Sequence, residues 1–109
     1  MTQIAYTVIV TITDDAKAQE WRGWLENGHI AAVIAGGANS AEIVKRDNDQ
    51  QATPGTTYEI RYKFDNRGIF EEYIKTHAPR LREDGLKRFP PEDGFTYSRT
   101  VGEIIEGKN

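Results

Sequence analysis

The chain has 109 residues, a formal net charge of −3 and no cysteine, which excludes disulfides, thiolate metal sites and a cysteine nucleophile and is typical of a reducing cytoplasm. Its mildly acidic balance argues against nucleic-acid binding, which needs a basic surface, and no apolar run approaches the ~20 residues that would cross a membrane. A chain of this length is one ordinary domain; we assign it residues 1–105 and expect residues 106–109 to be a flexible C-terminal end.

The first third of the chain predicts a strand followed by an interrupted helix. Residues 4–13 alternate between two faces and are rich in β-branched side chains, which is typical of a strand. Asp14 and Asp15 suit the start of a helix, where their carboxylates cap free N–H groups. Four residues then follow helical spacing: Ala18, Trp21, Trp24 and Leu25. Gly28 interrupts or ends this helix, and residues 29–35 form a further turn or two.

The middle of the chain predicts a pair of strands joined by a polar loop. Residues 38–45 suit the second strand. Residues 56–64 suit the third, and its alternation directs Tyr58 and Tyr62 to the core. Between the two strands, residues 47–55 are polar and contain proline and glycine, which is typical of a loop.

A second helix and a last strand follow. The helix begins after Asp65 or Asn66 and ends at Pro79, because proline disfavours a helical conformation in the residue before it. Its apolar stripe consists of Phe70, Tyr73, Ile74 and His77. Residues 95–101 predict the last strand, and Arg99 lies on its apolar face.

The resulting order, β-α-β-β-α-β, predicts the ferredoxin-like α+β sandwich. In this fold a four-stranded antiparallel sheet carries both helices on one face, and the hydrophobic strand faces meet the helices. The opposite face is more polar, although it contains Ile9. The sequence leaves open whether that face is solvated or packs on a second copy of the chain.

Two histidines are candidate catalytic residues. His77 ends the apolar stripe, where it could act as a general base, bind haem or a metal, or simply pack against the chain reversal at Pro79. His29 follows Gly28 and could face the same pocket as His77. A metal site usually needs three or four ligands, and the chain has only these two histidines and no cysteine. We therefore expect no metal and no cofactor.

Aromatic residues are candidate ligand-binding residues. Trp21 and Trp24 are three positions apart, which is about 300° of helical rotation, so they cannot both point straight at the sheet. One belongs in the core, and the other lines a pocket edge or a dimer contact. The hydroxyls of Tyr58 and Tyr62 need partners if they are buried. Alternatively, these tyrosines line a pocket that binds a phenolic or quinone-like ligand.

Arginines are the other candidate binding residues. A basic cluster lies within residues 77–89 and consists of Arg80, Arg82, Lys87 and Arg88. It could bind a carboxylate or phosphate by forked contacts, or form a solvated turn that pairs with its own acidic neighbours. Arg99 differs, because its strand face points inward and an inward arginine needs an anion from the protein or a ligand. We therefore rank Arg99 first.

Several motifs occur in a fixed order along nearly the whole chain: Tyr6-Thr7-Val8, Trp21-x-x-Trp24, His29-Ile30, Tyr58-x-x-x-Tyr62, Tyr73, His77-Ala78-Pro79-x-Leu81-Arg82, Gly85-Leu86-x-Arg88-Phe89 and Arg99. With these motifs the chain resembles a small bacterial family of unknown function in the dimeric α+β barrel superfamily. Ala31 stands where that family has proline. Thr7, Ile9 and Thr11 stand where it has polar amides, so amide-based binding is not expected there.

The resemblance implies a homodimer that forms through the sheet face, with a pocket between each sheet and its helices. The superfamily includes cofactor-independent monooxygenases, small isomerases, lactonases and haem-degrading enzymes, together with members that have no known catalysis, so the fold does not fix the function. The first hypothesis is a homodimeric small-molecule-binding or accessory protein, whose ligand would be small and anionic or aromatic.

The alternative is a cofactor-independent monooxygenase or isomerase that acts on an aromatic or cyclic ketone. In this hypothesis His77 or His29 acts as the base, and Arg99 stabilises an enolate-like charge. Haem binding through His77 is a third possibility.

Overall fold

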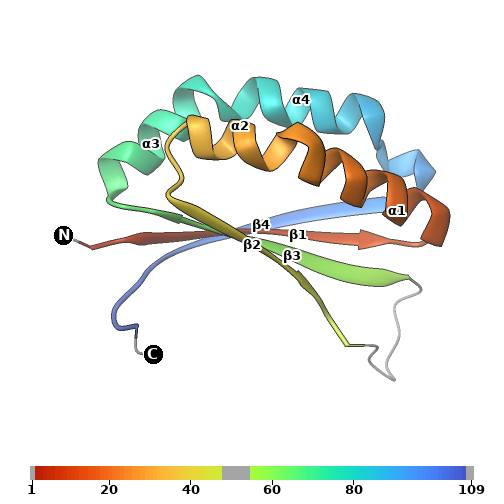
Figure 1. Ribbon diagram of the computed structural model, residues 1–109, viewed down its shortest axis with the longest axis horizontal. Helices are drawn as coiled ribbons and strands as arrows, with labels where there is room; N and C mark the ends of the chain where they lie inside the picture. Colours follow the sequence, from red (N-terminus) through yellow and green to blue (C-terminus); the bar gives the residue numbers. More distant parts are fainter. Residues whose placement is uncertain (1, 48–54, 108–109) are drawn as a thin grey trace.

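The computed structural model describes residues 2–47 and 55–107, and it has two layers, a sheet and a set of helices on one face of that sheet (Figure 1). The strands are β1 (Ile4–Ile12), β2 (Ser40–Lys45), β3 (Thr56–Phe64) and β4 (Phe95–Glu103). The helices are α1 (Asp15–Trp24), α2 (Ile30–Ala35), α3 (Arg67–Thr76) and α4 (Ala78–Arg88), with two short helical segments, η1 (Leu25–His29) and η2 (Pro91–Asp93).

The four strands form one antiparallel sheet in the order β2-β3-β1-β4. Two helical stretches, one from α1 to α2 and the other from α3 to α4, cover the same face (Figure 1). The predicted ferredoxin-like α+β arrangement is therefore confirmed. β1 lies at the centre, where Val8 is opposite Ile60 of β3 and Arg99 of β4.

The core lies between the sheet and the helices, because every second strand residue faces the helical layer. From β1 and β3 the buried side chains are Ile4, Tyr6, Val10, Ile12, Tyr58, Ile60, Tyr62 and Phe64. The helices add Trp21, Leu25, Val33, Phe70, Tyr73 and Leu81. Tyr58 and Tyr62 therefore take the inward orientation that the alternation predicts.

The first helical stretch bends at Gly28, whose φ is 151°. Glycine adopts such positive φ values without the steric cost that other residues incur. The segment η1 therefore separates α1 from α2, which confirms that Gly28 interrupts the predicted helix.

Helix α4 corrects the prediction that Pro79 ends the second helix and that residues 77–89 form a turn. Helix α3 ends at Thr76, and Pro79 lies in the first turn of α4. At that position proline is tolerated, because the first N–H groups of a helix have no intrahelical acceptor. As a result the basic cluster is displayed on a helix, with its members on different sides.

The strand bounds differ from the predicted ones by at most two residues. β3 has the predicted bounds, whereas β2 begins at Ser40 and β4 continues to Glu103. Most of the predicted loop over residues 47–55 and part of the predicted flexible end at residues 106–109 lie outside the described residues.

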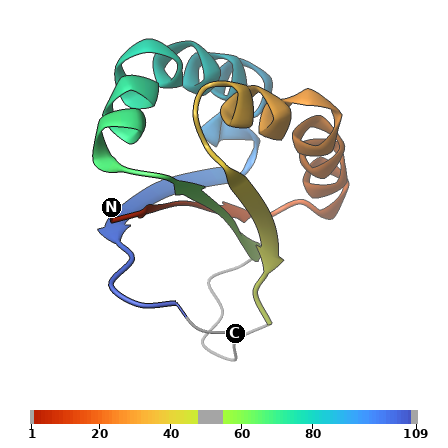
Figure 2. The ribbon, with the colours of Figure 1, turned by 60° about the vertical axis from the view of Figure 1, so that its left-hand side comes forward.

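No helix of the described residues lies on the outer face of the sheet (Figures 1 and 2). On β1 this face presents Ala5, Thr7, Ile9 and Thr11, all partly buried. The segment that follows β4 runs beneath this face rather than over the helices (Figure 2). The described helices therefore leave the outer face uncovered, and only the segment after β4 runs along that side.

Candidate functional site

A cavity opens between the inner face of the sheet and the helices. It has a volume of about 60 Å³, and about 560 Å³ of empty space when its open mouth is counted. Strands β1, β3 and β4 form its floor, and all four helices contribute to its walls. Its lining is mainly apolar and aromatic with a few polar groups, which is the usual character of a small-molecule site.

One wall of the cavity is a stacked aromatic pair. The rings of Trp24 and His29 have centroids 4.1 Å apart and an interplanar angle of 22°. Opposite them, Gly85 of α4 lies so close to Trp24 that an added Cβ would be 3.3 Å from its ring. The kink at Gly28 and the absence of a side chain at Gly85 together position this pair.

The two tryptophans divide as their spacing predicts. Trp21 is 2% exposed and packs its ring on Tyr58 at 5.2 Å, so it belongs to the core. Trp24 is only partly buried and lies at the pocket wall. Both tryptophans line the cavity, whereas Tyr58 lines a separate groove beside α1.

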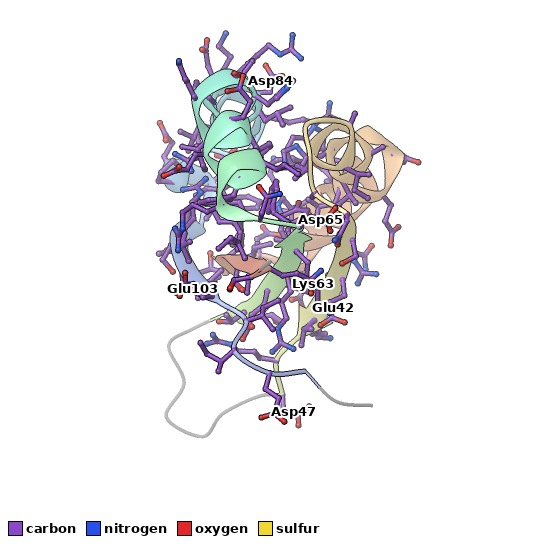
Figure 3. The ribbon with its side chains drawn as sticks, turned by 90° about the vertical axis from the view of Figure 1, so that its left-hand side faces the viewer. Glu42, Asp47, Lys63, Asp65, Asp84 and Glu103 are labelled. Carbon is purple, nitrogen blue, oxygen red and sulfur yellow. The ribbon has the colours of Figure 1, made fainter. Side chains whose placement is uncertain are left out.

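The imidazole of His29 is held neutral at physiological pH. Burial lowers its pKa to about 4, because the charged form would lose its hydration, and the negative charge of Asp84 offsets this only in part. Asp84 itself lies on the side of the helical layer remote from the sheet (Figure 3). A neutral imidazole offers the cavity one hydrogen-bond donor and one acceptor.

The polar side of the cavity is built around the hydroxyl of Tyr6. Arg82 of α4 donates from Nη2 to this oxygen over 3.2 Å, and Arg99 of β4 donates from Nε over 3.1 Å. Tyr6 is 2% exposed, and all three residues line the cavity. Two positive charges therefore converge on one neutral oxygen at the cavity wall.

Three further tyrosines in the cavity wall remain protonated. Burial raises the pKa of Tyr62 far above its usual range, and it raises the pKa values of Tyr73 and Tyr97 to about 12. Their hydroxyls therefore act as hydrogen-bond donors near neutral pH. Tyr97 uses its hydroxyl to donate to the carbonyl of Phe89 over 2.8 Å.

His77 lies at the junction of α3 and α4 and is not part of the cavity lining. Its N–H donates to the carbonyl of Tyr73, its own carbonyl accepts from Leu81, and its ring lies against Gly36. The expectation that both histidines face one pocket is therefore wrong, since the cavity contains His29 alone. The separation follows from α4, a helix that the sequence pattern does not predict.

The residues of the basic cluster also differ in whether they reach the cavity. Arg80 is exposed on α4 and is not part of the cavity lining, and Lys87 pairs with Glu83 over 3.0 Å. Arg88 is exposed, with its guanidinium 5.8 Å from the centre of the Phe89 ring. Only Arg82 reaches the cavity, where it meets Arg99.

Tyr6 is a site residue that the sequence alone does not reveal. Its inward position on the first strand was readable from the alternation, but its meeting with Arg99 depends on the register between β1 and β4. In that register Tyr6 is opposite Val101, one inward position away from Arg99. A short chain gives no direct signal of such a register.

Neither a metal site nor a membrane span is found in the part of the chain that the structure describes. Within residues 2–47 and 55–107, no three histidine, aspartate or glutamate side chains lie close enough together to hold a metal ion. No helix in the same residues is long and apolar enough to cross a membrane.

The fold is shared with many solved structures. A dimeric ferredoxin-like protein from an uncultured marine organism superposes with a TM-score of 0.78 at 8% identity, over 99% of this chain and 100% of that one. A protein of the ethyl tert-butyl ether d (EthD) family from Bacillus halodurans gives 0.69 at 12% identity, over 96% and 100% of the two chains.

A third similar structure is that of SnoaB, a cofactor-independent oxygenase from Streptomyces nogalater, with a TM-score of 0.65 at 9% identity over 98% and 97% of the two chains. At these identities the likeness shows the fold alone. No curated protein sequence matches the chain significantly. The family model described as domain of unknown function DUF4286 matches residues 3–105, and the chain belongs to this family.

Proposed function

We propose that this protein is a homodimeric binding or accessory protein that takes a small flat molecule, aromatic or cyclic, into the cavity between its sheet and helices. The observation that carries the proposal is the stacked Trp24–His29 pair at the wall of an open, mainly apolar cavity. Flat aromatic faces favour offset stacking with a further ring, and such contacts contribute about 0.5–1.5 kcal/mol beyond the burial of area.

The chain offers a direct spectroscopic test of this proposal. Both of its tryptophans line the cavity, so intrinsic tryptophan fluorescence reports on this site alone. Titration with 1,4-naphthoquinone, a flat neutral molecule, should quench the emission along a saturable curve, and isothermal titration calorimetry should return the same affinity. Quenching that stays linear with quinone concentration and gives no heat would reject the site.

Matched variants locate the binding. Val8 lines the cavity from β1, and Val8→Phe should fill it and weaken quinone binding at least tenfold. Ile34→Phe adds a ring at a position on α2 that is 43% exposed, and it should leave the affinity unchanged. If both variants bind as the wild type does, the quinone occupies another site.

The homodimer is supported by the uncovered outer face of the sheet and by the description of similar solved proteins as dimeric. This face is hollowed between β1, β2 and β3, where Thr7, Glu42 and Arg61 are among the lining residues. Light scattering of the purified chain should give twice the monomer mass. A bacterial cytoplasmic location suits a chain without cysteine, and cell fractionation would test it.

A second candidate function is that of a cofactor-independent monooxygenase or isomerase that acts on an enolisable aromatic ketone. The observation that favours it is the neutral imidazole of His29 in the cavity wall. This group could accept a proton from a substrate C–H, while the cavity arginines hold the enolate oxygen. A pKa near 4 makes His29 a weak base, and this function therefore ranks second.

Oxygen uptake with anthrone tests the oxygenase. Anthrone and O₂ give anthraquinone and water, so one oxygen atom becomes the new carbonyl and the other leaves as water. The wild type should accelerate anthraquinone formation over buffer, His29→Gln should abolish the acceleration, and His77→Gln should retain it. A wild-type rate equal to that in buffer would reject an oxygenase that acts on ketones of this type.

A further inference from the structure

The cavity contains an arrangement of charge that a neutral ligand would not require. Two guanidinium groups from distant parts of the chain, Arg82 on α4 and Arg99 on β4, meet at the hydroxyl of Tyr6. A tyrosine hydroxyl near neutral pH carries no charge that could balance them. The like charges therefore face each other across a single neutral acceptor.

No acidic partner compensates these charges in the part of the chain that the structure describes. Every ion pair found within residues 2–47 and 55–107 uses another cation. The acids on the same two elements either pair with other cations or, like Asp84, act on His29 and not on these arginines. Glu83 pairs with Lys87, Glu103 pairs with Arg67 over 3.6 Å, and Asp84 lies on the far side of the helical layer (Figure 3).

Arg82 also has unused hydrogen-bonding capacity. Its Nε is buried and has no hydrogen-bond partner within the described residues. A buried donor without a partner costs free energy, and the cost is larger when the group is charged. An anion placed between the two guanidinium groups would satisfy this donor and reduce the repulsion between the charges.

The arrangement of Arg82 and Arg99 around Tyr6 differs from the surface ion pairs of the protein. Arg46 and Arg61 both reach Glu59 on the outer face of the sheet, where each charge has a carboxylate partner. The inner face has the opposite composition, with two arginines and no carboxylate at hand among the described residues. The positive charge of the cavity is therefore not repeated on the outer face of the same strands.

We propose that Arg82 and Arg99 recognise the anionic group of the ligand, and that the ligand is a planar aryl acid whose ring lies against Trp24 and His29. The inference deepens the proposed function and depends on it. Arginine presents a planar fork of donors that suits a carboxylate or a phosphate. The acid group displaces the tyrosine hydroxyl as the acceptor for both arginines.

Three probes with one ring system test the recognition of the anion by isothermal titration calorimetry. They are 1-naphthoate, the neutral 1-naphthamide and 1-naphthyl phosphate. The wild type should bind naphthoate at least tenfold more tightly than the amide. A stronger preference for the phosphate than for the carboxylate also supports the anion site and assigns the ligand to the phosphate monoesters.

Two variants and one control assign the preference to the arginines. Arg99→Gln and Arg82→Gln should each weaken the binding of naphthoate much more than that of naphthamide, so that the preference for the acid is lost. Arg80→Gln, on the exposed side of α4, should retain the full preference. Arg99 lies on the edge strand, so its variant keeps the test valid if Arg82→Gln unfolds.

The outcomes separate this inference from the proposed function. If the amide and the acid bind the wild type equally, the anion site is rejected while the aromatic cavity stands. If neither binds at millimolar concentration, both proposals are rejected. If the preference survives in Arg99→Gln and Arg82→Gln, the anion is recognised elsewhere and the assignment is overturned.

Discussion

Gly94 forms the turn between the short helical segment η2 and strand β4. Its φ is 95°, its carbonyl accepts from the N–H of Thr13, and a Cβ at this position would clash with the Thr13 hydroxyl. We expect Gly94→Ala to lower the free energy of unfolding by about 1–3 kcal/mol, the cost of holding a non-glycine residue in this region. Urea denaturation measures the change.

Gly23 provides a matched control of opposite sign. It lies inside α1, and an added Cβ would meet only the side chain of Asn27, at 4.0 Å. Gly23→Ala should raise the free energy of unfolding by about 0.5–1 kcal/mol, because alanine loses less backbone entropy in a helix. Equal effects of the two substitutions would contradict the role assigned to the backbone conformation of Gly94.

His29 links stability to pH. Its pKa is about 4 in the folded chain, against 6.5 for an ordinary histidine, so between these values the unfolded chain binds more protons. The free energy of unfolding should therefore rise with pH through this window. The contribution of His29 to it is fully present above pH 6.5 and is lost as the pH falls towards 4. At about 1.4 kcal/mol per pKa unit, His29 can change the free energy of unfolding by at most roughly 3 kcal/mol over this pH range.

The variant His29→Gln isolates this contribution. Its free energy of unfolding, measured by urea denaturation at about pH 7.5 and about pH 5, should differ less between the two conditions than that of the wild type. Glu59, whose pKa is lowered by hydrogen bonds from Arg46 and Arg61, acts at lower pH and remains in both proteins. An unchanged difference in the variant would show that His29 titrates normally in the folded chain.

At the scale of elements, helix caps set where α1 and α3 begin. The Oδ1 of Asn66 accepts from the N–H of Ile69 over 2.9 Å, and Asp14 caps α1 in the same way. We expect Asn66→Ala to cost about 1 kcal/mol of stability and Asn66→Asp to be nearly neutral, because aspartate keeps the accepting oxygen. Thermal denaturation followed by circular dichroism would measure both, and equal losses would contradict a capping role.

The elements that the sequence predicted well are those whose signal is local. Two such signals are the alternation along residues 4–13 and 56–64 and the break at Gly28. They depend on neighbours only a few positions away, and the structure contains the strands and the break that they predict. Pro79 was ambiguous, because proline is compatible both with the end of one helix and with the first turn of the next. The tertiary structure selects the second option and so creates α4.

The candidate site was less predictable, because it depends on contacts between distant elements. Arg99 was expected to point inward from its strand face; its Nε reaches the hydroxyl of Tyr6, while the residue as a whole is exposed. Arg82 donates to the same Tyr6 oxygen only because residues 78–88 form α4 and this helix packs against the sheet. His77 was a reasonable candidate on its helical stripe, yet the beginning of α4 at Ala78 leaves it outside the cavity.

At the scale of the whole molecule, the two faces of the sheet have different roles. The inner face contributes the core and the cavity. The outer face has no helical cover from the residues that the structure describes, and its ion pairs lie towards β2 and β3. Towards β4 the outer residues are neutral and small, since Thr7, Ile9 and Thr11 lie opposite Thr100, Ser98 and Thr96. A neutral, partly apolar strip along the central strand suits contact with a second copy.

Ile9 lies at the middle of this strip, opposite Glu59 of β3 and Ser98 of β4. In a homodimer related by a two-fold axis, each copy presents the same face, so Ile9→Glu would bring new negative charges together beside Glu59. We expect light scattering to give the dimer mass for the wild type and half that mass for Ile9→Glu. The monomeric variant should retain its far-ultraviolet circular dichroism, because the inner core is unchanged.

Ile34→Glu makes the same chemical change on α2, which lies on the helical side of the sheet and where this side chain is 43% exposed. It should leave the dimer intact. If Ile9→Glu also remained dimeric, the two copies would have to meet through the helices or the strand edges, and the outer sheet face would be solvated.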